Sequence, residues 1–308
     1  MDAREATWST AGEALHVVRL HLRRTVRIAL IAAATACAAV SAPVAAAMGD
    51  ARVAVLQVAL RARHLYAGPI DGELGPGTTG AVLALQRRTG LVPDGVPGPR
   101  TLRALGRFVS PTLGSRPLSL GAVGGDVVEL QFLLAWHGFP SGAFDGTFGA
   151  RTQAALLRFQ RWAGLEPAGV AGPATVRALQ APPPTSPIRL AWPVRAPLGD
   201  GFGPRGDRFH AGIDLEAPYG TPVRAAGPGR VVFVGLAAGF GKLVVVEHAG
   251  GIETYYAHLS RIVVVLDEPV TVGSLLGLVG ATGDATGPHL HFEVRLRGAA
   301  VDPLSALD

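Results

Sequence analysis

Cysteine and lysine are almost absent from the 308-residue chain, which contains one of each, Cys37 and Lys242. Cys37 lies close to the N-terminus, so a chain that lost this end would have neither disulfides nor thiolate metal ligands. Nearly all of the positive charge is carried by arginine. Aromatic residues make up only 6% of the chain, but hydrophobic residues make up 48%, which excludes an intrinsically disordered protein.

The uncharged run near the N-terminus is short. Ile28–Val40 covers 13 residues, whereas a membrane-spanning helix needs about 20. Arginines precede this run and Ala45-Ala46-Ala47 follows it, which is the layout of a secretory signal peptide. We therefore predict that residues 1–47 are an export signal, that the mature protein is secreted to the cell wall or periplasm, and that it has no membrane attachment after cleavage. An uncleaved anchor and a lipoprotein modified at Cys37 stay open.

Charge gives little information about partners. Removal of residues 1–47 takes away five arginines and three acidic residues, which lowers the formal net charge from +5 to +3. So small a charge gives no reason to expect a nucleic-acid partner, and we expect none. The 41 glycines and 24 prolines predict many turns between short elements.

An internal repeat occupies the region after the export segment. Residues 56–105 match residues 130–179 without a gap. The matched pairs include a Leu-Gln pair, an Asp-Gly turn and a Gly-Pro pair. In sequence order they are Leu56-Gln57 with Leu130-Gln131, Asp71-Gly72 with Asp145-Gly146, and Gly98-Pro99 with Gly172-Pro173.

Each copy predicts three helices, because two stretches have helical apolar spacing and a third begins with proline at an early helical position. The predicted helices are Val53–His64, one from Pro76 or Thr78 to Arg88, a short one from Gly98, Val127–His137, Ala150–Trp162 and Gly172–Leu179. We therefore predict two small all-α modules, at residues 51–106 and 120–180.

The second copy contains Asp-Gly-x-Phe-Gly at Asp145–Gly149 and Phe159-Gln160 in its long helix. This pattern resembles the three-helix type of peptidoglycan-binding domain. The resemblance implies that both modules bind peptidoglycan, with Asp71 and Asp145 as candidate contacts. These aspartates are equally suited to shaping turns, and a purely structural role for the modules stays open.

The chain changes character after the second module. Residues 181–190 are rich in proline, which predicts a stiff linker that holds the last domain at a distance from the modules. In residues 191–308, β-branched runs bounded by Gly or Pro predict a mostly antiparallel all-β domain. The predicted strands are 231–234, 243–247, 253–258, 262–266, 275–279 and 291–296.

Two short stretches of this last domain contain candidate metal ligands. One is Phe209–Asp214, with His210 and Asp214, and the other is Gly287–Glu293, with His289 and His291. Side chains two residues apart on a strand share a face, so His289 and His291 are expected to point the same way. Imidazoles and one carboxylate suit a zinc site with an open position for water.

The order of motifs in residues 192–304 closely resembles the lysostaphin-type, or LytM-like, zinc metalloendopeptidases, which cut peptidoglycan peptides. The blocks that carry the resemblance are Gly201–Arg205, His210–Val231, Tyr256–Ser260 and Gly280–Glu293. The resemblance implies one Zn²⁺ per chain, held by His210, Asp214 and His291. It implies that His258 and His289 assist catalysis, by taking a proton from the attacking water and by stabilising the oxyanion or protonating the leaving amine.

The sequence therefore predicts an exported, monomeric zinc endopeptidase that cleaves peptide cross-links of peptidoglycan. Candidate groove residues are Tyr219, Phe240 and Tyr256, although Tyr256 is equally suited to a packed strand position. The alternative is a non-catalytic wall-binding scaffold that activates another hydrolase. That alternative predicts the loss of a ligand, and none is lost. The bond that is cut stays open.

Overall fold

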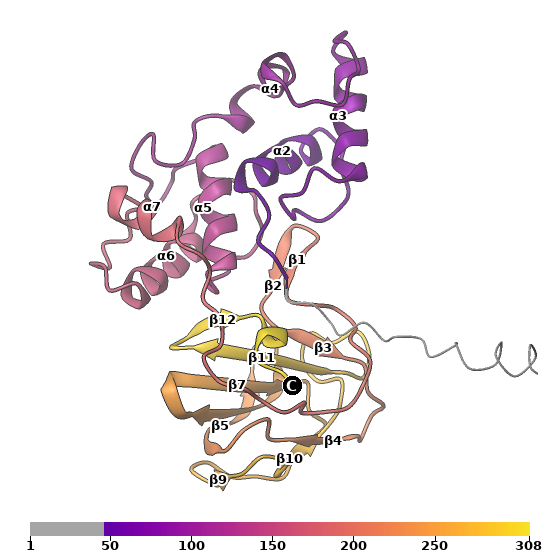
Figure 1. The fold of residues 1–308 in the computed structure, drawn as a ribbon, viewed down its shortest axis with the longest axis vertical. Helices are drawn as coiled ribbons and strands as arrows, with labels where there is room; N and C mark the ends of the chain where they lie inside the picture. The colour runs from indigo at the N-terminus through magenta and orange to yellow at the C-terminus, as the bar shows by residue number, and fades with distance from the viewer. Residues whose placement is uncertain (1–45) are drawn as a thin grey trace, which may run out of the picture. The chain divides into compact units, whose positions relative to one another are not determined.

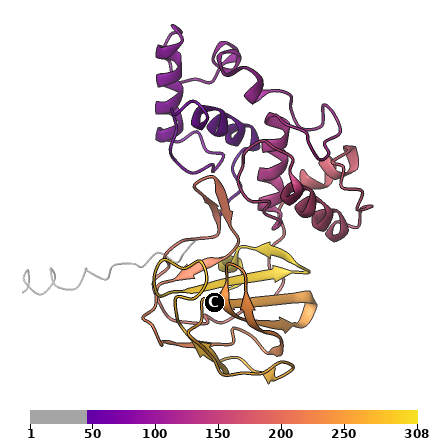
Figure 2. The same ribbon diagram turned by 180° about the vertical axis from the view of Figure 1, so that it is seen from behind.

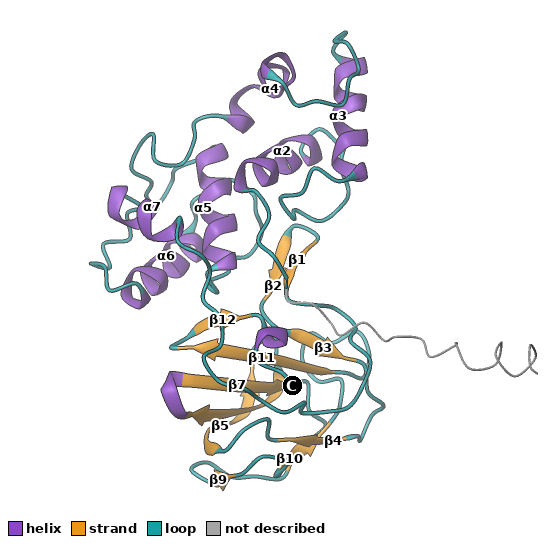
Figure 3. Cartoon of the chain, in the orientation of Figure 1, coloured by secondary structure: helices purple, strands orange, loops and turns teal. Residues whose placement is uncertain are grey.

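The computed structural model describes residues 46–308, so nearly all of the predicted export segment lies outside the described residues. The described residues all belong to one compact unit. Helices occupy the first part of the described chain and strands the last part (Figures 1 and 3). Among the described residues, no helix has both the length and the apolar character that a bilayer-spanning segment requires.

Each repeat folds into three helices, as predicted. The first module contains α2 (Ala51–Arg61), α3 (Pro76–Arg88) and α4 (Pro99–Leu105), followed by the 3₁₀ helix η1 (Gly106–Val109). The second contains α5 (Gly125–Trp136), α6 (Ala150–Trp162) and α7 (Pro173–Leu179). Proline is the first residue of α3, α4 and α7, where its missing N–H costs no helical hydrogen bond.

A buried glutamine network explains why the repeat conserves its Gln and Asp-Gly positions. The Gln57 side chain donates to Asp71 Oδ1 at 2.6 Å and accepts from the Gly72 amide at 2.9 Å. Gln131 makes the same contacts in the second module, with Asp145 and with the Gly146 amide. The matched glutamines Gln86 and Gln160 bind the next turn in each module in a similar way. A glutamine side-chain amide on a helix therefore binds the following turn at four places in the two modules.

The C-terminal domain contains twelve short strands in three antiparallel sheets within the described residues. The strands are β1 (Gly203–Arg205), β2 (Arg208–His210), β3 (Ile213–Leu215), β4 (Pro222–Arg224), β5 (Gly229–Ala237), β6 (Gly241–His248), β7 (Ile252–Ala257), β8 (Arg261–Ile262), β9 (Pro269–Val270), β10 (Leu275–Leu278), β11 (Leu290–Leu296) and β12 (Ala299–Val301). Two further 3₁₀ helices are η2 (Ala249–Gly251) and η3 (Pro303–Ser305).

The largest sheet has the order β12-β11-β7-β6-β5-β9, and β3 pairs with β11 beside this path. Figure 2 shows the same sheet from behind. A second sheet has the order β4-β10-β8, and β1 and β2 form a separate hairpin. The predicted strand over 262–266 is mostly wrong, because β8 ends at Ile262 and Val265 and Leu266 face solvent instead of a sheet neighbour.

The hydrophobic core of the last domain continues into the helical modules. Ala54 and Ile70 of the first module and Phe132, Trp136 and Phe144 of the second belong to the same buried cluster as the sheet residues. The linker also returns to the domain, since Leu190 forms a bridge with Leu307. The predicted separation by a stiff linker is therefore wrong, because apolar side chains of the modules are buried against the strands.

Candidate metal centre

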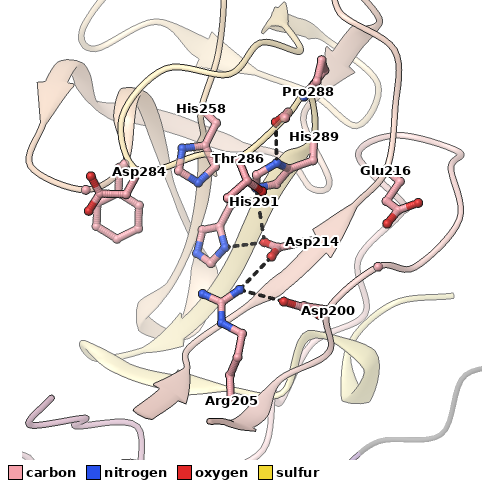
Figure 4. Close-up of a pocket in the computed structure, with 14 residues that line it drawn as sticks. Asp200, Arg205, Asp214, Glu216, His258, Asp284, Thr286, Pro288, His289 and His291 are labelled. Carbon is pink, nitrogen blue, oxygen red and sulfur yellow. Dashed lines mark hydrogen bonds and ion pairs between the residues drawn. The ribbon is translucent and has the colours of Figure 1, made fainter. Parts of the chain in front are cut away.

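Strand pairing brings the three predicted metal ligands together. β3 and β11 are antiparallel neighbours, and their register sets Asp214 directly opposite His291. His210 ends β2 and approaches the same point. Asp214 Oδ1 lies 2.8 Å from His291 Nδ1 and 3.2 Å from His210 Nε2, and the two imidazole nitrogens are 3.0 Å apart (Figure 4, which labels Asp214 and His291).

These three groups fit a zinc ion. They form a compact set of His, Asp and His donors, the ligand types that zinc takes in catalytic sites. Donor atoms around a tetrahedral zinc ion lie about 3.3 Å apart, if each metal–ligand bond is about 2.0–2.1 Å long. The observed separations of 2.8–3.2 Å need only a small opening. Three protein ligands also leave a fourth position for water.

Hydrogen bonds at the far side of each imidazole fix its tautomer. His210 Nδ1 lies 2.8 Å from the carbonyl oxygen of Gly201, which can only accept, so Nδ1 carries the proton and Nε2 is the free ligand atom. His291 Nε2 lies 3.0 Å from Glu293 Oε1, so Nε2 keeps its proton and Nδ1 becomes the ligand atom once it has lost its own proton. Such outer partners are the usual means of orienting metal-binding histidines.

The site is electrostatically prepared for a cation. Asp214 is partly buried, which by itself raises its pKa, but its interactions with His210 and His291 outweigh burial and hold the pKa of this carboxyl well below its usual range. Burial lowers the pKa of His291, yet its bonds to Asp214 and Glu293 raise it to about 9. A metal ion therefore has to displace a proton from His291 before it binds.

His258 and His289 lie beside the three ligands. The ring centroids of His258 and His289 are 4.7 Å apart, and His289 Nε2 is 3.8 Å from Asp214 Oδ1. His258 Nδ1 binds the Thr282 carbonyl at 2.7 Å and His289 Nδ1 binds the Gly287 carbonyl at 2.9 Å. In both rings Nδ1 therefore carries the proton, which leaves a lone pair on Nε2.

The environment of His258 keeps its imidazole neutral. Burial is the largest cause that lowers the pKa of His258, and the neighbouring His291 and His289 lower it further. Its backbone is also unusual, because φ is +58°, a left-handed conformation that non-glycine residues adopt rarely. The backbone amide of His258 donates to the Phe240 carbonyl at 2.8 Å. This bond and the bond from the ring to Thr282 together hold the turn after β7 in place.

Four of the five groups, Asp214, His258, His289 and His291, line a pocket of about 650 Å³ (Figure 4). Phe240 is on its wall, with its ring centroid 5.8 Å from that of His291. Glu216 and Asp284 also line the pocket and make its rim acidic. Both carboxylates belong to motif blocks that contain histidines, but neither was predicted as a site residue, because neither was needed as a metal ligand or proton carrier.

Two further predicted groove residues lie elsewhere. Tyr256 has an exposed fraction of 0%, and its hydroxyl accepts a hydrogen bond from the Ala226 amide at 2.9 Å. The predicted substrate contact is therefore wrong for this residue. Its side chain lies on the core face of β7. Tyr219 is 68% exposed and is not among the residues that line the pocket.

The predicted module contacts shape turns. Asp71 Oδ1 accepts from the Glu73 amide at 2.9 Å, and Asp145 Oδ1 accepts from the Thr147 amide at 2.8 Å. Asp71 also lines a smaller pocket of about 370 Å³ in the first module, together with Tyr66. The turn-shaping interpretation of the two aspartates therefore has direct support, and their contact with a ligand stays a prediction.

Two residues that contact the ligands were missed by the sequence analysis. Glu293 is 2% exposed and bridges His291 and Arg295, whose Nε lies 2.7 Å from Glu293 Oε2. Arg205 lies 3.2 Å from Asp214 Oδ2 and 2.9 Å from Asp200 Oδ2. Glu293 could have been found from its position, because it follows His291 by two residues and shares its face of β11. Arg205 gave no comparable signal.

The fold and the site define a class of protein, a hydrolase with a His/Asp/His metal centre on an antiparallel sheet. Residues 208–303 match the family model described as peptidase family M23, and residues 49–105 and 123–179 each match the peptidoglycan binding domain model. The C-terminal domain therefore belongs to peptidase family M23, and two peptidoglycan-binding domains precede it.

Similar proteins match about a third of this chain. The chain is 49% identical over 98 residues to the DD-carboxypeptidase/endopeptidase Mpg of Neisseria meningitidis, which covers 32% of this chain and 23% of that protein. It is 39% identical over 122 residues to the cell division protein DipM of Caulobacter vibrioides, covering 39% of this chain and 20% of that one. The chain thus spans about a quarter or less of the length of these relatives.

Solved structures give a similar result. The catalytic domain of lysostaphin from Staphylococcus simulans is 32% identical, with a TM-score of 0.34, and the match covers 35% of this chain and 90% of that one. A zinc-containing peptidase from Vibrio cholerae is 37% identical, with a TM-score of 0.35, over 37% of this chain and 38% of that chain.

Proposed function

We propose that this protein is a zinc-dependent endopeptidase that hydrolyses peptide bonds of peptidoglycan. The observation that carries the proposal is the convergence of the donor atoms of His210, Asp214 and His291, with His258 and His289 beside them in a pocket that Asp214 and His291 also line. Relatives from Neisseria and Vibrio are named DD-carboxypeptidase/endopeptidase and DD-endopeptidase. Their names support a DD-endopeptidase activity for this chain.

When bound by His210, Asp214 and His291, zinc would supply a water molecule of lowered pKa, about 7, and would polarise the scissile carbonyl. Glu293 keeps the Nδ1 lone pair of His291 directed at this position, and the Gly201 carbonyl does the same for Nε2 of His210. The protein therefore contributes fixed ligand orientation, which saves reorganisation during the reaction.

The two remaining histidines are suited to proton transfer. The neutral His258 imidazole has its Nε2 lone pair available, so we assign it to accepting the proton of the attacking water. His289, whose ring lies beside that of His258, is assigned to the oxyanion or to the leaving amine. Only an imidazole titrates near neutral pH without perturbation, so both roles suit histidine.

Substrate contacts are proposed for the pocket wall. Phe240 offers an apolar surface next to His291. Tyr219 is exposed and could contact a polymeric substrate that extends beyond the pocket. Tyr256 is no longer a candidate, because its side chain is buried. One zinc ion and one chain suffice for this chemistry, and a monomer is the proposed form.

The two N-terminal modules support a wall-bound location. They belong to a peptidoglycan-binding family, and a cell-wall hydrolase family implies an extracytoplasmic location. We propose peptidoglycan as the partner of the modules and residues 1–47 as the signal for export. Asp71 is the better candidate for ligand contact, because it lines a pocket.

Digestion of purified sacculi tests the proposal. The products would be identified by mass spectrometry, with a chelated sample and the His289→Ala variant beside the wild type. We expect new peptide ends that disappear in both. The exposed His64 in the first module provides a matched control, since His64→Ala should keep full activity.

The outcome also separates the proposal from its alternative. A protein that binds sacculi and zinc but releases no peptide from sacculi of several cross-link chemistries would contradict the endopeptidase. A wall-binding scaffold would then be favoured, and it would be tested by adding a second hydrolase. A protein that binds no zinc would contradict both the cofactor and the mechanism.

A further inference from the structure

We propose that Trp136 in the second helical module is a positioning residue for the metal ligand His210, so that the modules form part of the catalytic unit and are more than wall anchors. The inference rests on the proposed zinc peptidase function. It concerns the hairpin of β1 and β2, which ends in His210 and contains Arg205.

Trp136 is the centre of an aromatic contact between α5 and this hairpin. Its ring centroid is 5.3 Å from that of Phe209 and 6.2 Å from that of Phe202, and both pairs meet edge to face. Phe202 and Phe209 are themselves 5.0 Å apart. Trp136 is 4% exposed, so its contact with the hairpin is closed to solvent. We call Trp136, Phe202 and Phe209 the hairpin cluster.

The hairpin cluster is connected directly to the metal ligand. Phe209 precedes His210, and Phe202 follows Gly201, whose carbonyl accepts the Nδ1 proton of His210 at 2.8 Å. Both ends of this hydrogen bond are therefore adjacent in sequence to an aromatic ring that packs on Trp136. A shift of either ring would move the imidazole or the carbonyl that orients it.

The tip of the same hairpin is held by both modules. The Ile70 amide of the first module donates to the Gly206 carbonyl at 2.8 Å, and the Phe144 amide of the second donates to the Asp207 carbonyl at 2.8 Å. Ile70 and Phe144 are equivalent positions of the repeat, which is offset by 74 residues. The two copies thus use the same turn to bind adjacent carbonyls of one hairpin.

The hairpin needs this support because it is an isolated two-stranded sheet of three-residue strands. A two-stranded hairpin is marginally stable by itself in water. The other two ligands lie on β3 and β11, which pair within the largest sheet. His210 is therefore the ligand whose position depends most on contacts outside its own sheet, and the modules provide those contacts.

The test measures zinc affinity of the full-length protein by competition with a chromophoric chelator. If Trp136 orients His210, Trp136→Ala should weaken zinc binding about tenfold or more, the usual effect of removing an outer partner of a metal ligand. Trp136→Phe keeps an aromatic ring against Phe209 and should restore most of the affinity. If Trp136 had only a structural role, the substitutions would change the unfolding midpoint but would not give loss of zinc affinity with alanine and recovery with phenylalanine.

Trp162 offers a matched control in the same module. It is half-buried and also contacts the strands, because its Nε1 donates to the Leu296 carbonyl at 3.1 Å, but its ring packs on Phe139 and Phe159 of its own module. Trp162→Ala should leave zinc affinity within about twofold of the wild type, since outer-partner effects are local. Equal losses in both alanine variants would overturn the proposal, because general docking would then be responsible.

A variant on the hairpin side covers the case in which Trp136→Ala fails to fold. Phe209→Leu leaves the module intact and removes the same ring contact, so it should weaken zinc binding in the same way, and adding Trp136→Phe should cause little further loss. Unchanged affinity in folded Trp136→Ala or in Phe209→Leu would overturn the proposal. A wild-type protein without zinc binding would instead refute the proposed function.

Discussion

His291 and Glu293 lie on the same face of β11, and the imidazole Nε2 is 3.0 Å from the buried carboxylate Oε1. The other carboxylate oxygen of Glu293 binds the guanidinium of Arg295. The arginine keeps the carboxylate ionised, and the carboxylate holds the histidine in the tautomer that leaves Nδ1 free. A metal ligand is thereby oriented by a chain of charges along one strand.

Glu293→Gln should weaken zinc binding about tenfold, because the neutral amide is a poorer acceptor for the His291 proton and can present its NH₂ group instead. Chelator competition measures the affinity. The nearby surface variant Glu253→Gln, whose carboxylate binds Tyr255, provides a control that should leave affinity unchanged. Equal affinities of Glu293→Gln and wild type would remove Glu293 from the metal centre.

The glutamine networks in the modules should be a large part of their stability. Gln131→Leu leaves the buried Gly146 amide and Thr152 hydroxyl without this partner, and unpaired buried groups cost about 1–3 kcal/mol each. We expect a loss of about 2–4 kcal/mol in the free energy of unfolding. Urea titration followed by tryptophan fluorescence would measure it. The exposed Gln180→Leu should change stability by less than about 0.5 kcal/mol.

The stability of the second module should fall in acid because of His137. This histidine is 1% exposed, and burial lowers its pKa below 6.5, so it folds as the neutral form. Below pH 6.5 the unfolded chain binds a proton that the folded chain does not, and folding therefore weakens by up to about 1.4 kcal/mol per pH unit until the folded pKa is reached. Above pH 6.5 the contribution is constant.

Comparison with His137→Phe isolates this contribution. The variant cannot titrate at this position, so its free energy of unfolding should change less than that of the wild type between pH 6.5 and pH 5. Urea titrations at several pH values measure both. Parallel pH profiles would show that His137 is not the responsible group.

Tyr256 and Phe240 should differ in their effects, although the sequence suggested both for the groove. Tyr256→Phe removes a buried hydroxyl that binds the Ala226 amide, so stability should fall by about 1–3 kcal/mol while kcat/KM on sacculi stays unchanged. Phe240→Ala changes the pocket wall and should lower kcat/KM. A loss of activity in folded Tyr256→Phe would return this residue to the substrate site.

Much of the architecture could be predicted because its signals are local. The repeat, the prolines that open helices and the Asp-Gly turns led to six helices close to those observed. The three ligands came from the order of motifs. Their convergence depends on the pairing of β3 with β11, which joins residues far apart in sequence and could only be expected from the family resemblance.

The rest depends on contacts between distant parts of the chain. Alternation on β7 does not tell which face is buried, and so Tyr256 was a candidate for the groove until its neighbours in the core were known. Arg205 binds Asp214 only because a hairpin folds back onto β3. The proline-rich linker suggested that the last domain is held apart from the modules. The contact between Trp136 and Phe209 joins residues far apart in sequence, so no local pattern predicts it.

The two helical modules are not interchangeable. Ile70 and Phe144 hold the same hairpin through equivalent amides, but only Phe144 also packs on Phe132, at a centroid distance of 5.8 Å. Exchanging the two copies by recombination would put isoleucine into an aromatic cluster and phenylalanine into a site shaped for isoleucine. Each copy is thus fitted to its own position beside the hairpin, and the symmetry of the repeat ends at these two side chains.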